Sequence, residues 1–284
     1  SSAASDVYKR QNTAVGFQSS LANTTGTLNA SFGDNSFRCN TTGANNTGLG
    51  TSALFHNTTA SFNTGVGSEA LSTNTTGANN VAVGRLALKC NTTASDNTAV
   101  GFSALTANTT GARNTAVGIN ALEVNTTGDD NTVLGSEALK SNTTASNNVA
   151  IGYVALALNT TGTNNVAVGA GALDANTTAD GNTAVGKTSL GTNTTGANNT
   201  AVGLDSLKLN TTGCLNVAVG KSALCTNTTG CTNTAIGRDA MLANTTGDYN
   251  VAVGHEALDT NTTADNNTAI GASSLAAVSY THLR

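Results

Sequence analysis

Apolar and polar residues follow one short pattern that returns along residues 12–277. A typical copy runs from Asn199 through Thr200-Ala201-Val202 to Gly203, and a leucine follows four residues later. β-Branched residues closed by a glycine predict a short strand over residues 199–202 and their equivalents. Alternate strand residues face opposite sides, so we expect Val and Thr to share a buried face, with a second close contact at the small Ala.

The segment after each glycine carries the second apolar anchor. Glu137-Ala138-Leu139-Lys140 is an example, with a small residue before the leucine. Periodicity cannot separate helix from strand in so short a run. We expect a short helical or 3₁₀ turn here, and we expect the glycine to supply a backbone conformation that other residues avoid.

The pattern has a strict period of 17 residues. We number its positions 1 to 17 from the first Asn of the Asn-Thr-Thr triplet. Positions 1, 2, 3, 7 and 11 hold Asn, Thr, Thr, Asn and Gly in all fifteen copies, and a partial copy begins at Asn12. Copies that stay alike occupy like surroundings, which is typical of a solenoid whose turns contact mainly their neighbours. The sequence therefore predicts an all-β or mainly β fold, a β-solenoid with one repeat per turn.

A stack of this kind would have a thin core. Fifteen turns spaced by about 4.8 Å predict a rod of roughly 70 Å. Each turn offers about two large aliphatic side chains, so we expect further stabilisation from stacked Asn and Thr ladders or from neighbouring chains.

The two ends do not follow the repeat. Residues 1–11 and 278–284 resemble translated sequencing adapters, because one DNA sequence and its reverse complement can encode much of both. Such segments are set aside when a fold is interpreted. Divergent caps are the alternative, and the repeat array spans residues 12–277.

Composition and charge exclude several classes of function. Charged residues are 10% of the chain, the formal net charge is −4, and Lys and Arg do not cluster. A nucleic-acid binder would need a clustered basic face. The apolar runs are only a few residues long, too short to cross a membrane.

The position 1 asparagines are the main candidates for chemistry. Each Asn-Thr-Thr is formally an N-glycosylation acceptor, and a stacked amide ladder is the alternative. Position 7 is equally invariant yet forms an acceptor only at Asn29, which favours a structural role there. The candidate glycosylation or ladder residues are Asn23, Asn40, Asn57, Asn74, Asn91, Asn108, Asn125, Asn142, Asn159, Asn176, Asn193, Asn210, Asn227, Asn244 and Asn261.

Two of the five cysteines are candidates for a disulfide. Cys214 and Cys231 share position 5 on consecutive copies, and stacking would bring their Cα atoms to about 4.8 Å. Cys39 and Cys90 share position 17 but lie three turns apart, roughly 14 Å, which is too far.

Catalytic chemistry has little support in the sequence. A unique active site should interrupt the repeat, and the nearest acidic cluster for a polysaccharide-cleaving β-helix is Asp129, Asp130 and Glu137. We expect no enzyme activity, no cofactor and no metal site. Acidic residues scatter over variable positions, unlike the regular Asp of calcium-binding repeats.

Short motifs within the repeat resemble a known family. Ala82-Val83-Gly84 and Ala235-Ile236-Gly237, each followed by x-x-Ala, resemble head repeats of trimeric autotransporter adhesins. The longer N-T-A-V-G-x-x-A-L-x-x-N-T-T-G unit is similar to repeats of bacterial and phage tail-fibre-like proteins. The resemblance covers residues 12–277 and implies β-rolls, assembled as trimers, that bind host surfaces.

These observations favour a structural role outside the cell. We expect an extracellular or cell-surface fibre or filament segment with a surface adhesion role, either glycosylated or bare, whose partners are further copies of itself and surface glycans. The self-association expected is a homo-oligomer or an end-to-end polymer. The alternative is a receptor- or glycan-binding phage tail fibre or trimeric adhesin shaft, with variable positions 5, 6, 12, 13, 16 and 17 facing the ligand.

Overall fold

A computed structural model describes residues 11–276 of the 284-residue chain. The two flanking segments assigned to adapters, residues 1–11 and 278–284, therefore lie outside the described residues apart from Gln11. The described part is all-β, and it contains no helix that could cross a membrane. Its strands are β1 (Thr13–Val15), β2 (Ala30–Phe32), β3 (Thr47–Leu49), β4 (Thr64–Val66), β5 (Val81–Val83), β6 (Thr98–Val100), β7 (Thr115–Val117), β8 (Thr132–Leu134), β9 (Val149–Ile151), β10 (Val166–Val168), β11 (Thr183–Val185), β12 (Thr200–Val202), β13 (Val217–Val219), β14 (Thr234–Ile236), β15 (Val251–Val253) and β16 (Thr268–Ile270).

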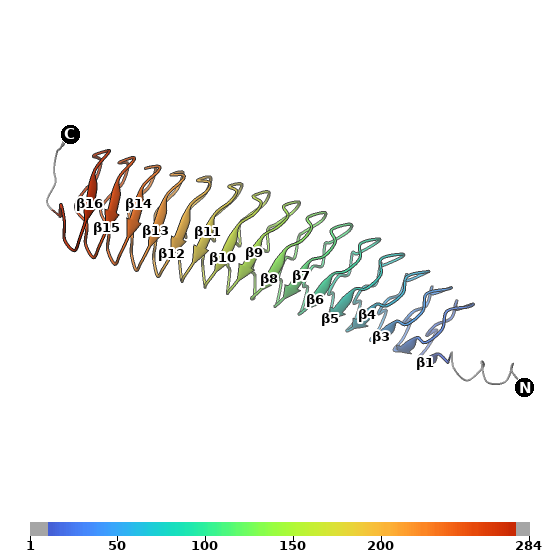
Figure 1. Cartoon of the computed structure of the whole chain (residues 1–284). Coiled ribbons are helices and arrows are strands. Elements are labelled where there is room, and N and C mark those ends of the chain that lie inside the picture. The colour runs from blue at the N-terminus through green and yellow to red at the C-terminus, as the bar shows by residue number, and fades with distance from the viewer. Residues whose placement is uncertain (1–10, 277–284) are drawn as a thin grey trace, which may run out of the picture. The chain divides into compact units, whose positions relative to one another are not determined.

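The chain divides into two compact units, one up to Glu137 and one from Ala138 onward. The first unit holds β1 to β8 and the second holds β9 to β16 (Figure 1). Inside each unit every strand pairs in parallel with the next, and the register shifts by one repeat, as from Thr98 to Thr115 or from Thr183 to Thr200. One repeat therefore makes one turn, and the predicted β-solenoid is confirmed.

The close contact predicted at position 9 is confirmed, but the face of positions 8 and 10, which was also expected to be buried, is not. From β2 to β16 the central residue, position 9, is buried, as Ala116 is. The flanking positions 8 and 10 point outward, and none of them is buried in any described strand. Leu134, at position 10, is 50% exposed. The prediction of a buried Val and Thr face was wrong.

The narrow interior of the turn explains this reversal. The core holds one large side chain per turn, usually the position 15 leucine, packed against small residues at positions 9 and 14. Where Phe37 replaces the leucine, position 9 of the next turn is Gly48, and an added Cβ would lie 2.5 Å from the Phe37 ring. Two rows of large residues cannot fit inside a 17-residue loop, so the β-branched residues face outward.

Positions 12 to 17 form turns rather than the predicted helical or 3₁₀ segment. The backbone is left-handed at positions 13 and 15, with φ of 53° at both Asn120 and Leu122. Left-handed residues break a helical run. They also direct peptide groups to adjacent turns, so the amide of Asn120 donates to the carbonyl of Phe102 at 2.9 Å.

The glycine at position 11 has the special conformation expected of it. Its φ is positive in every copy, for example 138° at Gly118, a region that is essentially restricted to glycine. No position 4 glycine has a positive φ, which agrees with alanine standing at that position in other copies.

Candidate functional site

The position 1 asparagines form a hydrogen-bonded ladder inside each unit. Asn108 is fully buried, and its Nδ2 donates to Oδ1 of Asn91 at 3.0 Å and to its own turn's Gly111 carbonyl at 2.8 Å. Its Oδ1 in turn accepts a hydrogen bond from Asn125 Nδ2 at 2.9 Å. The same arrangement recurs in the second unit, where Asn210 Nδ2 donates to Asn193 Oδ1 at 2.8 Å. Stacked amides of this kind are the ladder that the sequence offered as one of two interpretations.

The position 7 asparagines form a second ladder, which the sequence marked only by its invariance. Asn114 Oδ1 accepts hydrogen bonds from the backbone amide of Asn131 at 3.0 Å and from its Nδ2 at 3.1 Å. Asn114 Nδ2 donates to the carbonyl of Gly128 at 2.8 Å, and that carbonyl also accepts from Asn125 at 3.0 Å. The position 4 carbonyl therefore joins the two ladders.

The ladder bears directly on N-glycosylation of position 1. An N-linked glycan replaces one of the two Nδ2 hydrogens, but both hydrogens of Asn108 are used in buried hydrogen bonds. Breaking such bonds leaves buried polar groups without partners, which costs about 1–3 kcal/mol each. The folded turn therefore favours the ladder over the glycan.

The two threonines of each triplet lie in different surroundings. The position 2 hydroxyl donates to the position 2 carbonyl of the next turn, as Thr109 does to Thr126 at 3.0 Å. The position 3 threonine is exposed in all fifteen copies. An O-linked glycan needs an accessible hydroxyl, so position 3 is the place where this fold could carry one.

The candidate disulfide cysteines lie next to each other. The Sγ atoms of Cys214 and Cys231 are 2.8 Å apart, and both thiols are free. The contact with Cys231 and partial burial raise the pKa of Cys214 to about 11. Thiolate rather than thiol attacks a disulfide, so the Cys214 thiol reacts slowly near neutral pH.

We expect oxidised glutathione to convert Cys214 and Cys231 into a disulfide, faster as the pH rises from 7 to 9. The reason is that the thiolate fraction grows towards the raised pKa of Cys214. Non-reducing peptide mapping by mass spectrometry measures the link. Cys39 and Cys90, which lie three repeats apart, are the internal control. Equal linkage of the control pair, or none of Cys214 with Cys231 at pH 9, would refute the prediction.

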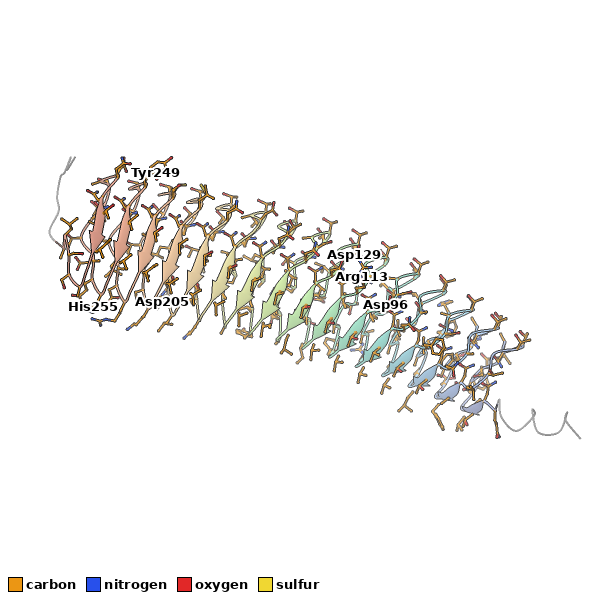
Figure 2. The ribbon with its side chains drawn as sticks, in the orientation of Figure 1. Asp96, Arg113, Asp129, Asp205, Tyr249 and His255 are labelled. Atoms are coloured by element: carbon orange, nitrogen blue, oxygen red, sulfur yellow. The ribbon has the colours of Figure 1, made fainter. Side chains whose placement is uncertain are left out.

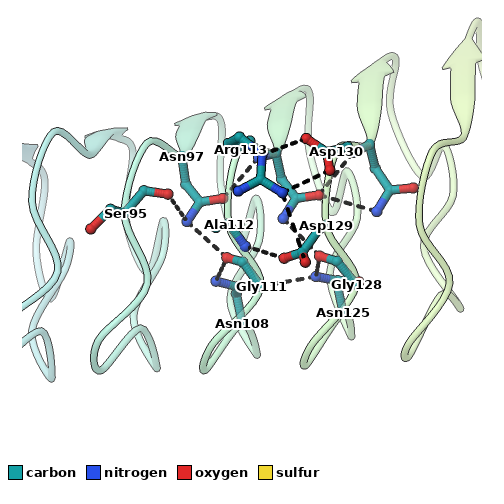
Figure 3. Close-up of polar contacts among 12 residues, drawn as sticks. Ser95, Asn97, Asn108, Gly111, Ala112, Arg113, Asn125, Gly128, Asp129 and Asp130 are labelled. Carbon is teal, nitrogen blue, oxygen red and sulfur yellow. Dashed lines mark hydrogen bonds and ion pairs between the residues drawn. The ribbon is translucent and has the colours of Figure 1, made fainter.

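The acidic candidates are held by structural contacts. Asp130 pairs with Arg113, with 2.6 Å from Nε to Oδ1, and this hydrogen bond lowers the pKa of the Asp130 carboxyl. Asp129 Oδ1 accepts the backbone amide of Ala112 at 2.7 Å, as Figure 3 shows. Glu137 lies at position 13, away from the positions 5 and 6 that hold the two aspartates. The turns do not assemble these three groups into an acid-base pair.

One cluster of possible metal-ligating side chains was not predicted from the sequence. Possible ligand atoms of Asp239, His255 and Glu256 lie within 4.8 Å of one another, because positions 12 and 13 of adjacent turns stack. Arg238 joins them, with its guanidinium 3.2 Å from Glu256 and 3.5 Å from Asp239. Both carboxylates of the cluster are therefore already paired with a cation of the chain, and we assign no metal to it.

Charged side chains line the edges of the turn, away from the strands. In the second unit Tyr249 at position 6 lies on one edge, and Asp205 and His255 at positions 13 and 12 lie on the opposite edge (Figure 2). The strand face between these edges carries positions 8 and 10, which hold no charged residue in any of the sixteen strands. This face, the outer strand face, is an uncharged surface of Thr, Val, Ile and Leu, with one Phe and one Ala.

Comparisons with known proteins leave the family open. No protein-family model and no curated protein sequence matches the chain. The resemblance to adhesin heads and tail fibres therefore rests on the repeat motif alone, and the function has to be argued from the geometry of the turns.

Proposed function

We propose that this chain is a segment of an extracellular structural fibre. The observation that supports it is the continuity of hydrogen bonding from turn to turn: strand pairs, two asparagine ladders and the position 2 threonines all bond to the next copy. A pull along the stack is shared among all these parallel bonds. A surface adhesion role and any glycans, on the position 3 threonines, belong to the same proposal.

We further propose that copies associate laterally through the outer strand face. The face carries no charge, so covering it costs no desolvation of charged groups. Its side chains repeat with every turn, so a partner that contacts each turn in the same way must have the same spacing between its own turns. Another copy of this chain meets that condition. Within one unit, eight strands of about 4.8 Å by 10 Å each give this face roughly 380 Å², about half the area per partner of a standard stable interface.

Light scattering coupled to size-exclusion chromatography tests the lateral association. We expect the full chain to elute as a multiple of 28.0 kDa. Replacing Val100, Val117 and Leu134 with lysine should return it to the single-chain mass, because three adjacent turns then place charges in the contact.

The matched control replaces Phe102, Ile119 and Ser136 with lysine, at position 12 of the same three turns. It should leave the mass of the assembly unchanged. A wild-type chain that elutes at 28.0 kDa at all concentrations would refute lateral association. Cryo-electron microscopy then distinguishes a bundle from an end-to-end polymer, which would form by pairing between strand edges of different copies.

The second candidate is a receptor- or glycan-binding tail fibre or adhesin shaft. In that function the variable positions 5, 6, 12, 13, 16 and 17 contact the ligand, while the invariant positions only maintain the turn. A hollow over positions 13, 16 and 17 of the first unit favours this candidate.

A further inference from the structure

A hollow forms where one small residue interrupts a row of large ones. Position 16 is Phe55, Ser72 and Lys89 on three consecutive turns of the first unit. Ser72 is 7% exposed and leaves the space between its two neighbours open. The hollow has a volume of about 330 Å³, and its lining also includes His56 and Glu69. A volume near 300 Å³ is at the lower end for small-molecule sites.

One wall of the hollow is an aromatic ring that is held in place. The guanidinium of Arg38, one turn earlier in the same row, lies 5.6 Å from the centre of the Phe55 ring. The His56 ring meets Phe55 edge-on, with ring centres 4.6 Å apart and an angle of 66° between the planes. The phenyl ring therefore presents a fixed apolar surface to the hollow.

The rim carries fixed hydrogen-bonding groups of both kinds. His56 Nδ1 lies 3.0 Å from the carbonyl oxygen of Ser72, and since a carbonyl only accepts, Nδ1 carries the hydrogen. In the neutral ring Nε2 then accepts a hydrogen bond. Lys89 Nζ and Glu69 Oε2 form an ion pair at 2.6 Å, so a donor and an acceptor stand side by side with no net charge.

We propose that this hollow binds one neutral pyranose ring of a surface glycan. A pyranose has an apolar face of C–H groups, which suits an aromatic ring, and a rim of hydroxyl groups that both donate and accept. Phe55 supplies the ring, Lys89 the donor, and Glu69 and His56 the acceptors. Since Lys89 and Glu69 neutralise each other, the arrangement fits an uncharged sugar better than a uronic acid or a phosphate.

The spacing of the position 16 side chains leaves room for one sugar ring stacked on Phe55. Phe55 and Lys89 are two turns apart, so their backbones are separated by about 9.6 Å. A sugar ring lying against Phe55 fills the space over Ser72, and its far side faces the Lys89 stem. With so few contacts we expect a dissociation constant on the order of 1 mM.

Nuclear magnetic resonance titration of the full chain tests the proposal. The probes are methyl glycosides of glucose, galactose, mannose and N-acetylglucosamine, with methyl glucuronide and inorganic phosphate as charged comparisons. We expect at least one neutral glycoside to shift signals of residues 52–89 in a saturable way, and to bind about tenfold or more tightly than the charged probes.

Three variants locate the site. Phe55→Ala should weaken binding at least about tenfold, since the stacking surface is lost. Ser72→Leu should abolish binding by filling the hollow, and the fold should tolerate it because Leu242 stands at position 16 in another turn. The control is Phe102→Ala, which removes an exposed phenyl ring that also has an arginine, Arg85, 5.6 Å from its centre.

The possible outcomes separate cleanly. Loss of binding in the first two variants with wild-type binding in the control supports the proposal. Overturning results are the absence of saturable shifts with every neutral glycoside up to about 50 mM, some fifty times the expected constant, or an equal loss in Phe55→Ala and Phe102→Ala. The site lies within one chain, so this test is independent of lateral assembly.

Discussion

A Gly118→Ala variant is expected to lose about 2–6 kcal/mol of unfolding free energy in the first unit. Two costs contribute. The φ of 138° is strained for any residue with a Cβ, and that Cβ would lie 2.5 Å from the carbonyl oxygen of Gly135 on the next turn. The stacked strands β7 and β8 would have to separate, and their hydrogen bonds would weaken. Urea denaturation followed by circular dichroism measures the loss, and hydrogen exchange shows whether amides of β7 and β8 lose protection first.

Gly271→Ala is the matched control for this variant. Gly271 occupies the same repeat position with φ of 114°, but an added Cβ there meets no described atom within 4 Å. The control therefore has the backbone strain without the collision, and it should lose about 1–3 kcal/mol of unfolding free energy. Equal losses in the two variants would mean that contact between turns is not what selects glycine.

An Asn108→Ala variant is expected to lose about 3 kcal/mol or more of unfolding free energy. The change removes three buried hydrogen bonds, to Asn91, Gly111 and Asn125, at distances of 3.0, 2.8 and 2.9 Å. The groups left behind are buried, and each unpaired one costs about 1–3 kcal/mol. Urea denaturation gives the total, and hydrogen exchange should place the loosened amides in the turns of Asn91, Asn108 and Asn125.

Thr110→Ala, in the same triplet, is the control. Thr110 is exposed, so the unfolding free energy of this variant should stay within about 0.5 kcal/mol of the wild-type value. If Asn108→Ala proved as mild as Thr110→Ala, the ladder would not be a major source of stability, and invariance of position 1 would need another cause.

The invariant polar residues could be found from the sequence, but their geometry could not. Fifteen copies of Asn at positions 1 and 7 indicate that each meets the same surroundings. Which amide hydrogen meets which carbonyl depends on how the turn closes. Only the folded turn shows that the Gly128 carbonyl accepts from both Asn114 and Asn125.

The hollow beside Phe55 illustrates a second limit. Phe55, Ser72 and Lys89 are ordinary residues at a variable position, and nothing in their order marks a site. The signal was present as a small residue between two large ones at a spacing of 17. It becomes a cavity only when position 16 is known to point outward and its neighbours are known to stack.

The strict period by itself determined the architecture. A repeat of 17 residues with no insertion indicates that like residues stack, and from this follow the β-solenoid, the two adjacent cysteines and the need for glycine at position 11. The tertiary structure alone decided which side of each strand faces inward. In a Thr-Ala-Val strand, either the alanine or the two flanking residues can face the interior. The usual preference places the larger residues inside. A 17-residue loop is too narrow for that, because its interior already holds one leucine per turn, so the alanine points inward and the β-branched residues form the outer strand face.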